Sequence, residues 1–112
     1  MSNPKNLDDC VELTRKKEPF TFNNVYAVYR EANALRIEPS TYTVYSYGQH
    51  YPMYVYDYEA CQWYGNNDRS TPTTNRHKSK FKPYSVAQWV DTETLSSIAM
   101  RGIVQTSAKR ME

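Results

Sequence analysis

The spacing of tyrosines constrains this chain more than any other feature. Eight of its 11 tyrosines lie between Tyr42 and Tyr64, and within 54–58 they recur at every second residue. Successive side chains of a β-strand point to opposite faces of a sheet, so this spacing predicts a strand with an aromatic face rimmed by hydroxyl groups. Such a face suits contact surfaces and base stacking better than a dry core. The predicted binding surface consists of Tyr45, Tyr47, Tyr54, Tyr56, Tyr58 and Tyr64.

The rest of the chain predicts one α+β domain over residues 1–112, a length near the common size of single domains. Aromatic and β-branched residues predict a hairpin that starts at Phe20 and returns through Leu35 and Ile37. Proline cannot donate to a ladder, so Pro52 is expected at a strand start or at a sheet edge. Further strands are expected at about 41–47, 53–58 and 61–64. We therefore predict an antiparallel meander of four or five strands, flanked by two or three short helices.

Helix signals occur near both ends of the chain. Asn6 is available as an N-cap for a segment with acids early and bases late, which matches the helix dipole, and this helix should end before Pro19. Asp91 is expected to cap a second helix that ends at Gly102. The inward-facing residues of that helix are expected to be Leu95, Ile98 and Ala99.

The segment 69–82 is strongly polarised, because it carries five cations and no acid occurs between Asp68 and Asp91. Ser70 or Thr71 is expected to cap a helix that continues to about residue 80. Free backbone amides and threonine hydroxyls at such a helix start suit a phosphate or carboxylate. The alternative is that the hydroxyls only cap the helix and the cations form a solvated face. The candidate residues for anion or nucleic-acid binding are Arg69, Thr73, Thr74, Arg76, His77, Lys78, Lys80 and Lys82.

The sequence contains no motif for catalysis or metal binding. His50 and His77 are its only histidines, and no spacing of histidine, cysteine and carboxylate matches a metal site. No Gly-x-Ser-x-Gly elbow or comparable signature surrounds a nucleophile. We therefore expect a protein that is not an enzyme and uses neither a metal nor a cofactor.

Cysteine usage and hydropathy predict a location inside a cell. Cys10 and Cys61 are the only cysteines, and two free, mostly buried thiols are favoured over one disulfide. The start of the chain lacks an apolar signal region, and no apolar run is long enough to span a bilayer, so no membrane partner is expected. Trp63 and Trp89 are both expected to cover the core.

Three blocks of the sequence together resemble a pattern found in small uncharacterised proteins encoded by bacteriophages. They are Tyr-Ser-Tyr-Gly-Gln-His-Tyr-Pro-Met-Tyr at 45–54, Trp-Tyr-Gly-Asn at 63–66, and a third block at 70–79 that contains Ser70, Thr73, Thr74, His77 and Ser79. The resemblance covers about the middle third of the chain. It implies a phage origin and a location in the host bacterial cytoplasm, and it brings no established activity with it.

Two functions fit these observations. The leading hypothesis is a non-catalytic phage accessory protein that binds and interferes with a host protein or nucleoprotein, such as a defence nuclease in the manner of an anti-CRISPR protein. Tyrosine, tryptophan and arginine dominate the hot spots of such interfaces. The alternative is direct binding of single-stranded DNA or RNA, in which tyrosines on the sheet stack on bases and the basic helix holds phosphates.

Overall fold

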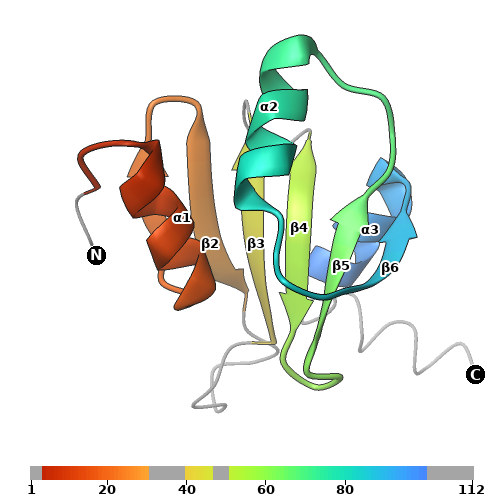
Figure 1. Cartoon of the computed structure of the whole chain (residues 1–112). Helices are drawn as coiled ribbons and strands as arrows, with labels where there is room; N and C mark the ends of the chain where they lie inside the picture. The colour runs from red at the N-terminus through yellow and green to blue at the C-terminus, as the bar shows by residue number, and fades with distance from the viewer. Residues whose placement is uncertain (1–3, 31–39, 47–50, 101–112) are drawn as a thin grey trace, which may run out of the picture.

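A six-stranded sheet forms the centre of the protein, with its strands in chain order (Figure 1). The computed structural model describes residues 4–30, 40–46 and 51–100. The strands are β1 (Phe20–Phe22), β2 (Val25–Arg30), β3 (Thr41–Ser46), β4 (Pro52–Asp57), β5 (Gln62–Asn66) and β6 (Val86–Val90), and the helices are α1 (Leu7–Arg15), α2 (Pro72–Phe81) and α3 (Thr92–Ala99). The α+β class is confirmed, and the sheet has more strands than the four or five predicted.

The additional strand is β6, which runs parallel to β5, whereas β1 to β5 pair antiparallel. Parallel neighbours need a crossover connection, and α2 provides it. β6 was missed because it is short and its side chains are mostly exposed, so no apolar alternation marks it. The hairpin was also predicted in the wrong place, since the chain already turns at Asn23 and Asn24 between β1 and β2. Leu35 and Ile37 lie outside the described residues.

The three helices begin where their capping residues predict. The Asn6 side chain accepts a hydrogen bond from the Asp9 amide at 2.8 Å, and the Asp91 carboxylate accepts one from the Thr94 amide at the same distance. Of the two candidate caps for α2, Thr71 is the one that accepts, from the Thr74 amide at 3.2 Å. α1 ends before Pro19 and β4 starts at Pro52, as predicted. The expected end of α3 at Gly102 lies outside the described residues.

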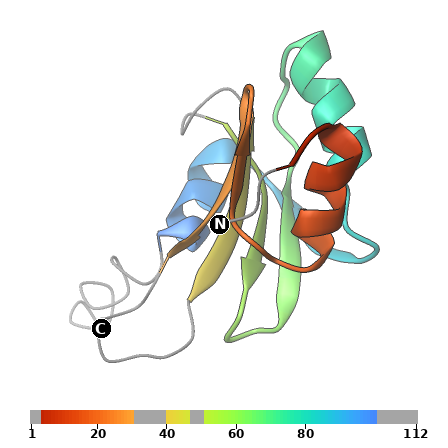
Figure 2. The same cartoon turned by 90° about the vertical axis from the view of Figure 1, so that its left-hand side faces the viewer.

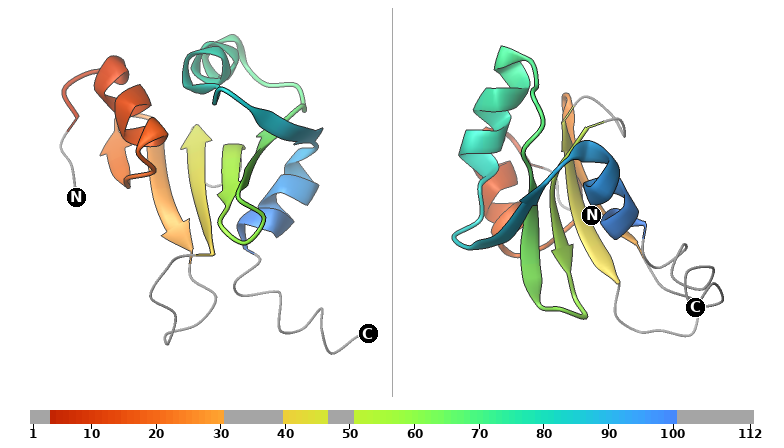
Figure 3. Two further views of the ribbon diagram at one scale, coloured as in Figure 1. Left: turned by 60° about the horizontal axis from the view of Figure 1, so that its bottom comes forward. Right: turned by 90° about the vertical axis from the view of Figure 1, so that its right-hand side faces the viewer.

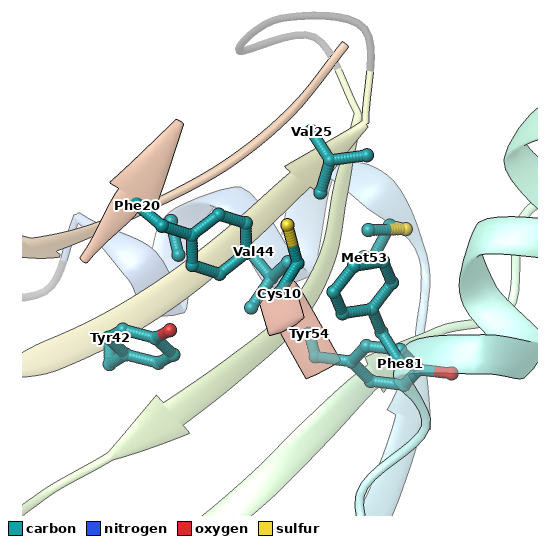
Figure 4. Packing of buried hydrophobic residues seen from close by; sticks show 9 residues of the cluster. Cys10, Phe20, Val25, Tyr42, Val44, Met53, Tyr54 and Phe81 are labelled. Carbon is teal, nitrogen blue, oxygen red and sulfur yellow. The ribbon is translucent and has the colours of Figure 1, made fainter. Parts of the chain in front are cut away.

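The helices enclose the sheet from both sides. α1 and α2 cover one face and α3 lies against the other (Figures 2 and 3). The larger core, beneath α1 and α2, includes Cys10, Phe20, Tyr42, Tyr54 and Phe81 (Figure 4). The smaller core, beneath α3, consists of Val55, Tyr64, Leu95 and Ala99. The two helical layers therefore leave little of the central strands open to solvent.

Both cysteine thiols are free, but only one is buried. Burial, with a contribution from the Asp9 charge, raises the pKa of the Cys10 thiol to about 11, so this thiol stays protonated and packs as an apolar group. Cys61 is exposed in the turn between β4 and β5, contrary to the prediction of two mostly buried thiols.

Three tyrosine hydroxyls on the sheet form hydrogen bonds with the helical layer that includes α1 and α2. The Tyr42 hydroxyl donates to the backbone carbonyl of Glu18 at 2.7 Å, and the Tyr54 hydroxyl donates to that of Lys78 at 2.6 Å. The Tyr29 hydroxyl likewise donates to the carbonyl of Lys17. Burial raises the pKa of Tyr42 and of Tyr54 well above the ordinary value, so both hydroxyls remain donors at any physiological pH.

We expect Tyr54→Phe to lower the free energy of unfolding by about 1 kcal/mol, because it leaves the Lys78 carbonyl without this donor. Tyr84→Phe is the matched control, since the Tyr84 side chain is 90% exposed and water replaces its hydroxyl contacts. Urea denaturation of both variants measures the difference. Equal stabilities would show that the buried hydroxyl does not fasten α2.

Candidate functional site

The predicted tyrosine surface is largely wrong. Tyr45, Tyr54 and Tyr64 are buried, with exposed fractions of 4%, 1% and 7%. Tyr54 and Tyr56 do share the sheet face that the alternation predicts, but α1 and α2 cover that face. Tyr56 and Tyr58 are half-buried, and Tyr47 lies outside the described residues. The alternation gave the shared face correctly and gave no information about what packs on it.

The five predicted cations do not form one cluster. Lys80 forms a salt bridge of 2.8 Å with Asp8 on α1, and its hydrogen bond and charge lower the pKa of that carboxyl. The Lys78 ammonium donates to the Tyr51 hydroxyl at 3.1 Å. Arg76 is exposed on α2. The two remaining cations, Arg69 and Lys82, line two different pockets near opposite ends of α2.

The first pocket, the hydroxyl pocket, lies at the start of α2 and has a volume of about 540 Å³. It contains three of the residues predicted to bind anions, namely Arg69, Thr73 and Thr74. It is lined by Ser46, Tyr51, Arg69, Ser70, Thr71, Thr73 and Thr74. Ser46 is fully buried, and its hydroxyl lies 3.1 Å from the Thr74 hydroxyl and 2.9 Å from Nδ1 of His77. This hydrogen-bond network attaches α2 to the end of β3.

Two of the three sequence blocks that carry the resemblance meet at this pocket, and the remaining block is hydrogen-bonded to the first. Ser46 belongs to the first block, whereas Thr74 and His77 belong to the third. Asn66, in the second block, donates to the carbonyl of Pro52 in the first at 2.8 Å. Hydrogen bonds between residues that are distant in the sequence thus link β3 to α2 and β5 to β4.

Burial lowers the pKa of His77, and the Arg76 charge lowers it further. The folded protein therefore binds a proton at His77 less tightly than the unfolded chain does, because the pKa of His77 in the unfolded chain is near 6.5. Stability should be fully present above this pH, fall as the pH drops below it, and level off below the lowered pKa of the folded state. Denaturation at a series of pH values should show this loss in the wild type but not in His77→Asn, in which the amide replaces Nδ1. Parallel pH curves for the two proteins would contradict the assignment.

The second pocket, the cationic aromatic pocket, lies between the end of α1 and the connection from α2 to β6, and has a volume of about 260 Å³. Its lining includes Trp63, Phe81 and Tyr84 together with three cations, Arg15, Lys17 and Lys82. Of the described residues that line it, none is acidic. Among these six residues, only Lys82 was predicted as a site residue.

The three cations of this pocket lie on aromatic rings. Distances from the charged group to the ring centroid are 5.2 Å for Arg15 on Tyr84, 4.4 Å for Lys17 on Tyr56 and 5.9 Å for Lys82 on Trp89. Such contacts contribute about 0.5–1 kcal/mol at exposed sites, less than a phosphate contact can offer a cation. Across the described part of the chain, none of these three cations forms a salt bridge. Their charge therefore remains available to an anion.

Both tryptophans were predicted to cover the core, but they differ in how far they are buried. Trp63 is half-buried, and its ring forms T-shaped contacts with the rings of Tyr42 and Tyr56, at centroid separations of 6.2 and 5.3 Å. Trp89 is 43% exposed on the edge strand β6, contrary to the prediction. Its ring lies so close to Gly65 on β5 that a Cβ there would approach it to 2.6 Å. Of the two tryptophans, only Trp63 lines the cationic aromatic pocket, and because Tyr42 and Tyr56 hold its ring, it forms a fixed wall there.

Comparison with family models, with curated proteins and with solved structures finds no match to this chain. Within 4–30, 40–46 and 51–100, no group of histidine, cysteine and carboxylate residues is arranged to hold a metal ion. None of the helices in these ranges combines the length and the apolar character needed to cross a membrane.

Proposed function

We propose that this protein binds single-stranded nucleic acid through the cationic aromatic pocket. The observation that carries the proposal is that an exposed ring, Tyr84, and a half-buried ring, Trp63, line one largely apolar cavity together with three cations that form no salt bridge with any described residue. Single-strand-binding proteins pair positive charge, which holds phosphates, with aromatic side chains, which stack on bases. An unpaired base is needed because the bases of a duplex are already stacked on one another.

The location of this pocket differs from that of the surface predicted from the tyrosine spacing. Trp63 and Tyr84 take the stacking role that was assigned to the tyrosines of β4, and Arg15 and Lys17 join Lys82 in the role assigned to the basic helix. Three cations in reach of one strand should neutralise about three phosphates, which gives a salt dependence of log K on log[salt] with a slope of about −2.

Titration of a fluorescently labelled oligothymidine tests the proposal. A strand of about 12 nucleotides is within the usual site sizes of single-strand-binding folds. We expect binding at low salt with the slope given above, and weaker binding of a duplex of the same length. Polyglutamate is the control for general attraction of anions. Absence of binding at low salt, or equal binding of polyglutamate, would rule out the proposal.

A second candidate is interference with a host protein by a phage-encoded accessory protein inside a bacterium. It is favoured by two large aromatic side chains at the surface, since Tyr84 is 90% and Trp89 is 43% exposed. Exposed aromatic residues are typical anchors of protein interfaces. If this function is correct, the protein captures a partner from a bacterial lysate, and the variants Tyr84→Ala and Trp89→Ala no longer capture it. The capture must also persist after nucleic acid has been removed from the lysate.

A further inference from the structure

We infer that the cationic aromatic pocket holds one nucleotide, with its base against Trp63 and its phosphate on the cations at the rim. This inference rests on the proposed function and names the unit of the ligand that the site recognises. It goes beyond general single-strand binding because it requires a base and a phosphate at the same place. The inference follows from the size of the pocket, the rigidity of its wall and the origin of its charges.

The size of the pocket limits what enters it. Its volume of about 260 Å³ is below the range of roughly 300–1,000 Å³ that is typical of pockets for drug-sized ligands. A single base is small enough for such a space, whereas a stack of consecutive bases is not. The strand on either side of the bound nucleotide therefore lies outside the pocket.

One wall of the pocket is rigid before any ligand binds. The T-shaped contacts with Tyr42 and Tyr56 fix the orientation of the Trp63 ring. Tyr42 is itself fully buried and hydrogen-bonded to the Glu18 carbonyl, so the support extends into the core. A ring held in this way loses little conformational entropy on binding, which favours stacking of a flat base.

The charges around the pocket come from two segments that meet only in the folded protein. Arg15 and Lys17 lie at the end of α1, and Lys82 follows α2. An anion bound among these cations would therefore contact both segments. The Arg15 guanidinium lies over the Tyr84 ring, 5.2 Å from its centroid, and forms no salt bridge with any described residue, so its N–H groups can donate to a phosphate.

The test uses the indole N–H signals in a ¹H–¹⁵N NMR spectrum, because Trp63 and Trp89 are the only tryptophans. Trp89 lies on the edge strand and does not line the pocket, so Trp89→Phe leaves one signal, that of Trp63. The probes are AMP, which has a base and a phosphate, and ribose 5-phosphate, which lacks the base. We expect AMP to shift the Trp63 signal and to displace labelled oligothymidine, and ribose 5-phosphate to do neither at the same concentration.

Trp63→Leu should weaken AMP binding by roughly 5- to 150-fold, the range for loss of one base-stacking contact. If this variant does not fold, the Trp63 signal of Trp89→Phe still decides the question. Binding of oligothymidine without any effect of AMP would overturn the inference and leave the proposed function intact. If neither ligand binds, both are wrong. If AMP shifts Trp63 and the strand does not bind, the pocket takes free nucleotides, so the inference stands and the proposed function fails.

Discussion

Asn66→Asp should lower the free energy of unfolding by about 3 kcal/mol or more, because Asn66 is fully buried and all of its polar atoms are used. Its amide nitrogen donates to the Pro52 carbonyl at 2.8 Å and to the Thr92 hydroxyl at 3.0 Å. Its side-chain oxygen accepts from the Asp68 amide at 2.8 Å. The substitution keeps the shape but removes both donors and places a negative charge beside the Pro52 oxygen.

Asn67→Asp is the matched control, since it makes the same chemical change at the next residue. The Asn67 side chain is exposed, and the hydrogen bond of this residue to Val90 comes from its backbone amide, which the substitution preserves. Urea denaturation followed by tryptophan fluorescence compares the two variants with the wild type. Similar losses in both would show that the hydrogen bonds of Asn66 do not hold β4, β5 and α3 together.

The pH dependence of Asn66→Asp gives an independent check. Burial disfavours the charged form of a carboxyl, so the pKa of the introduced group should be raised in the folded state above the value of about 3.9 in the unfolded chain. The folded state then binds the proton more tightly than the unfolded state, and the stability deficit should shrink as the pH falls toward 4. A deficit that does not change between pH 7 and pH 4 would mean that the carboxylate reaches solvent.

Local signals in the sequence predicted the helices well. Asn6, Thr71 and Asp91 cap the three helices because a side-chain oxygen one position before a helix satisfies amides within the first turn, whatever the rest of the fold does. β6 had no such signal, since its pairing with β5 depends on a crossover of 19 residues, 67–85. Such a pairing is a property of the tertiary structure, and a five-residue segment with exposed side chains does not encode it locally.

The sites were predicted less well, for two physical reasons. Helix periodicity already separates Arg76 and Lys80 from Lys78, because residues two positions apart on a helix point to different sides. That signal was present in the sequence and indicated that the cations do not converge. The cationic aromatic pocket is a different case, since Arg15, Trp63 and Tyr84 meet only when α1 and the connection after α2 pack on the same sheet face. No spacing in the sequence reveals that contact.

Reversing two charges of the cationic aromatic pocket should abolish most of the nucleic-acid affinity if the proposed function is correct. Arg15→Glu with Lys82→Glu replaces two attractive contacts with two repulsive ones, and each change is worth about 2 kcal/mol for groups about 4 Å apart in water. We therefore expect the affinity for oligothymidine at low salt to fall on the order of 100-fold or more, after allowance for screening. The slope of log K against log[salt] should decrease in magnitude by about 1.4.

Lys5→Glu with Arg76→Glu is the matched control, because it changes the formal net charge by the same amount, from +2 to −2, at exposed residues that do not line the pocket. Long-range attraction depends on the total charge and would weaken equally in both double variants, whereas direct phosphate contacts depend on where the charges lie. The control should therefore lose only a small part of the affinity. Equal losses in the two double variants would mean that the strand is held by the overall field of the protein, and the pocket would then have no part in recognition.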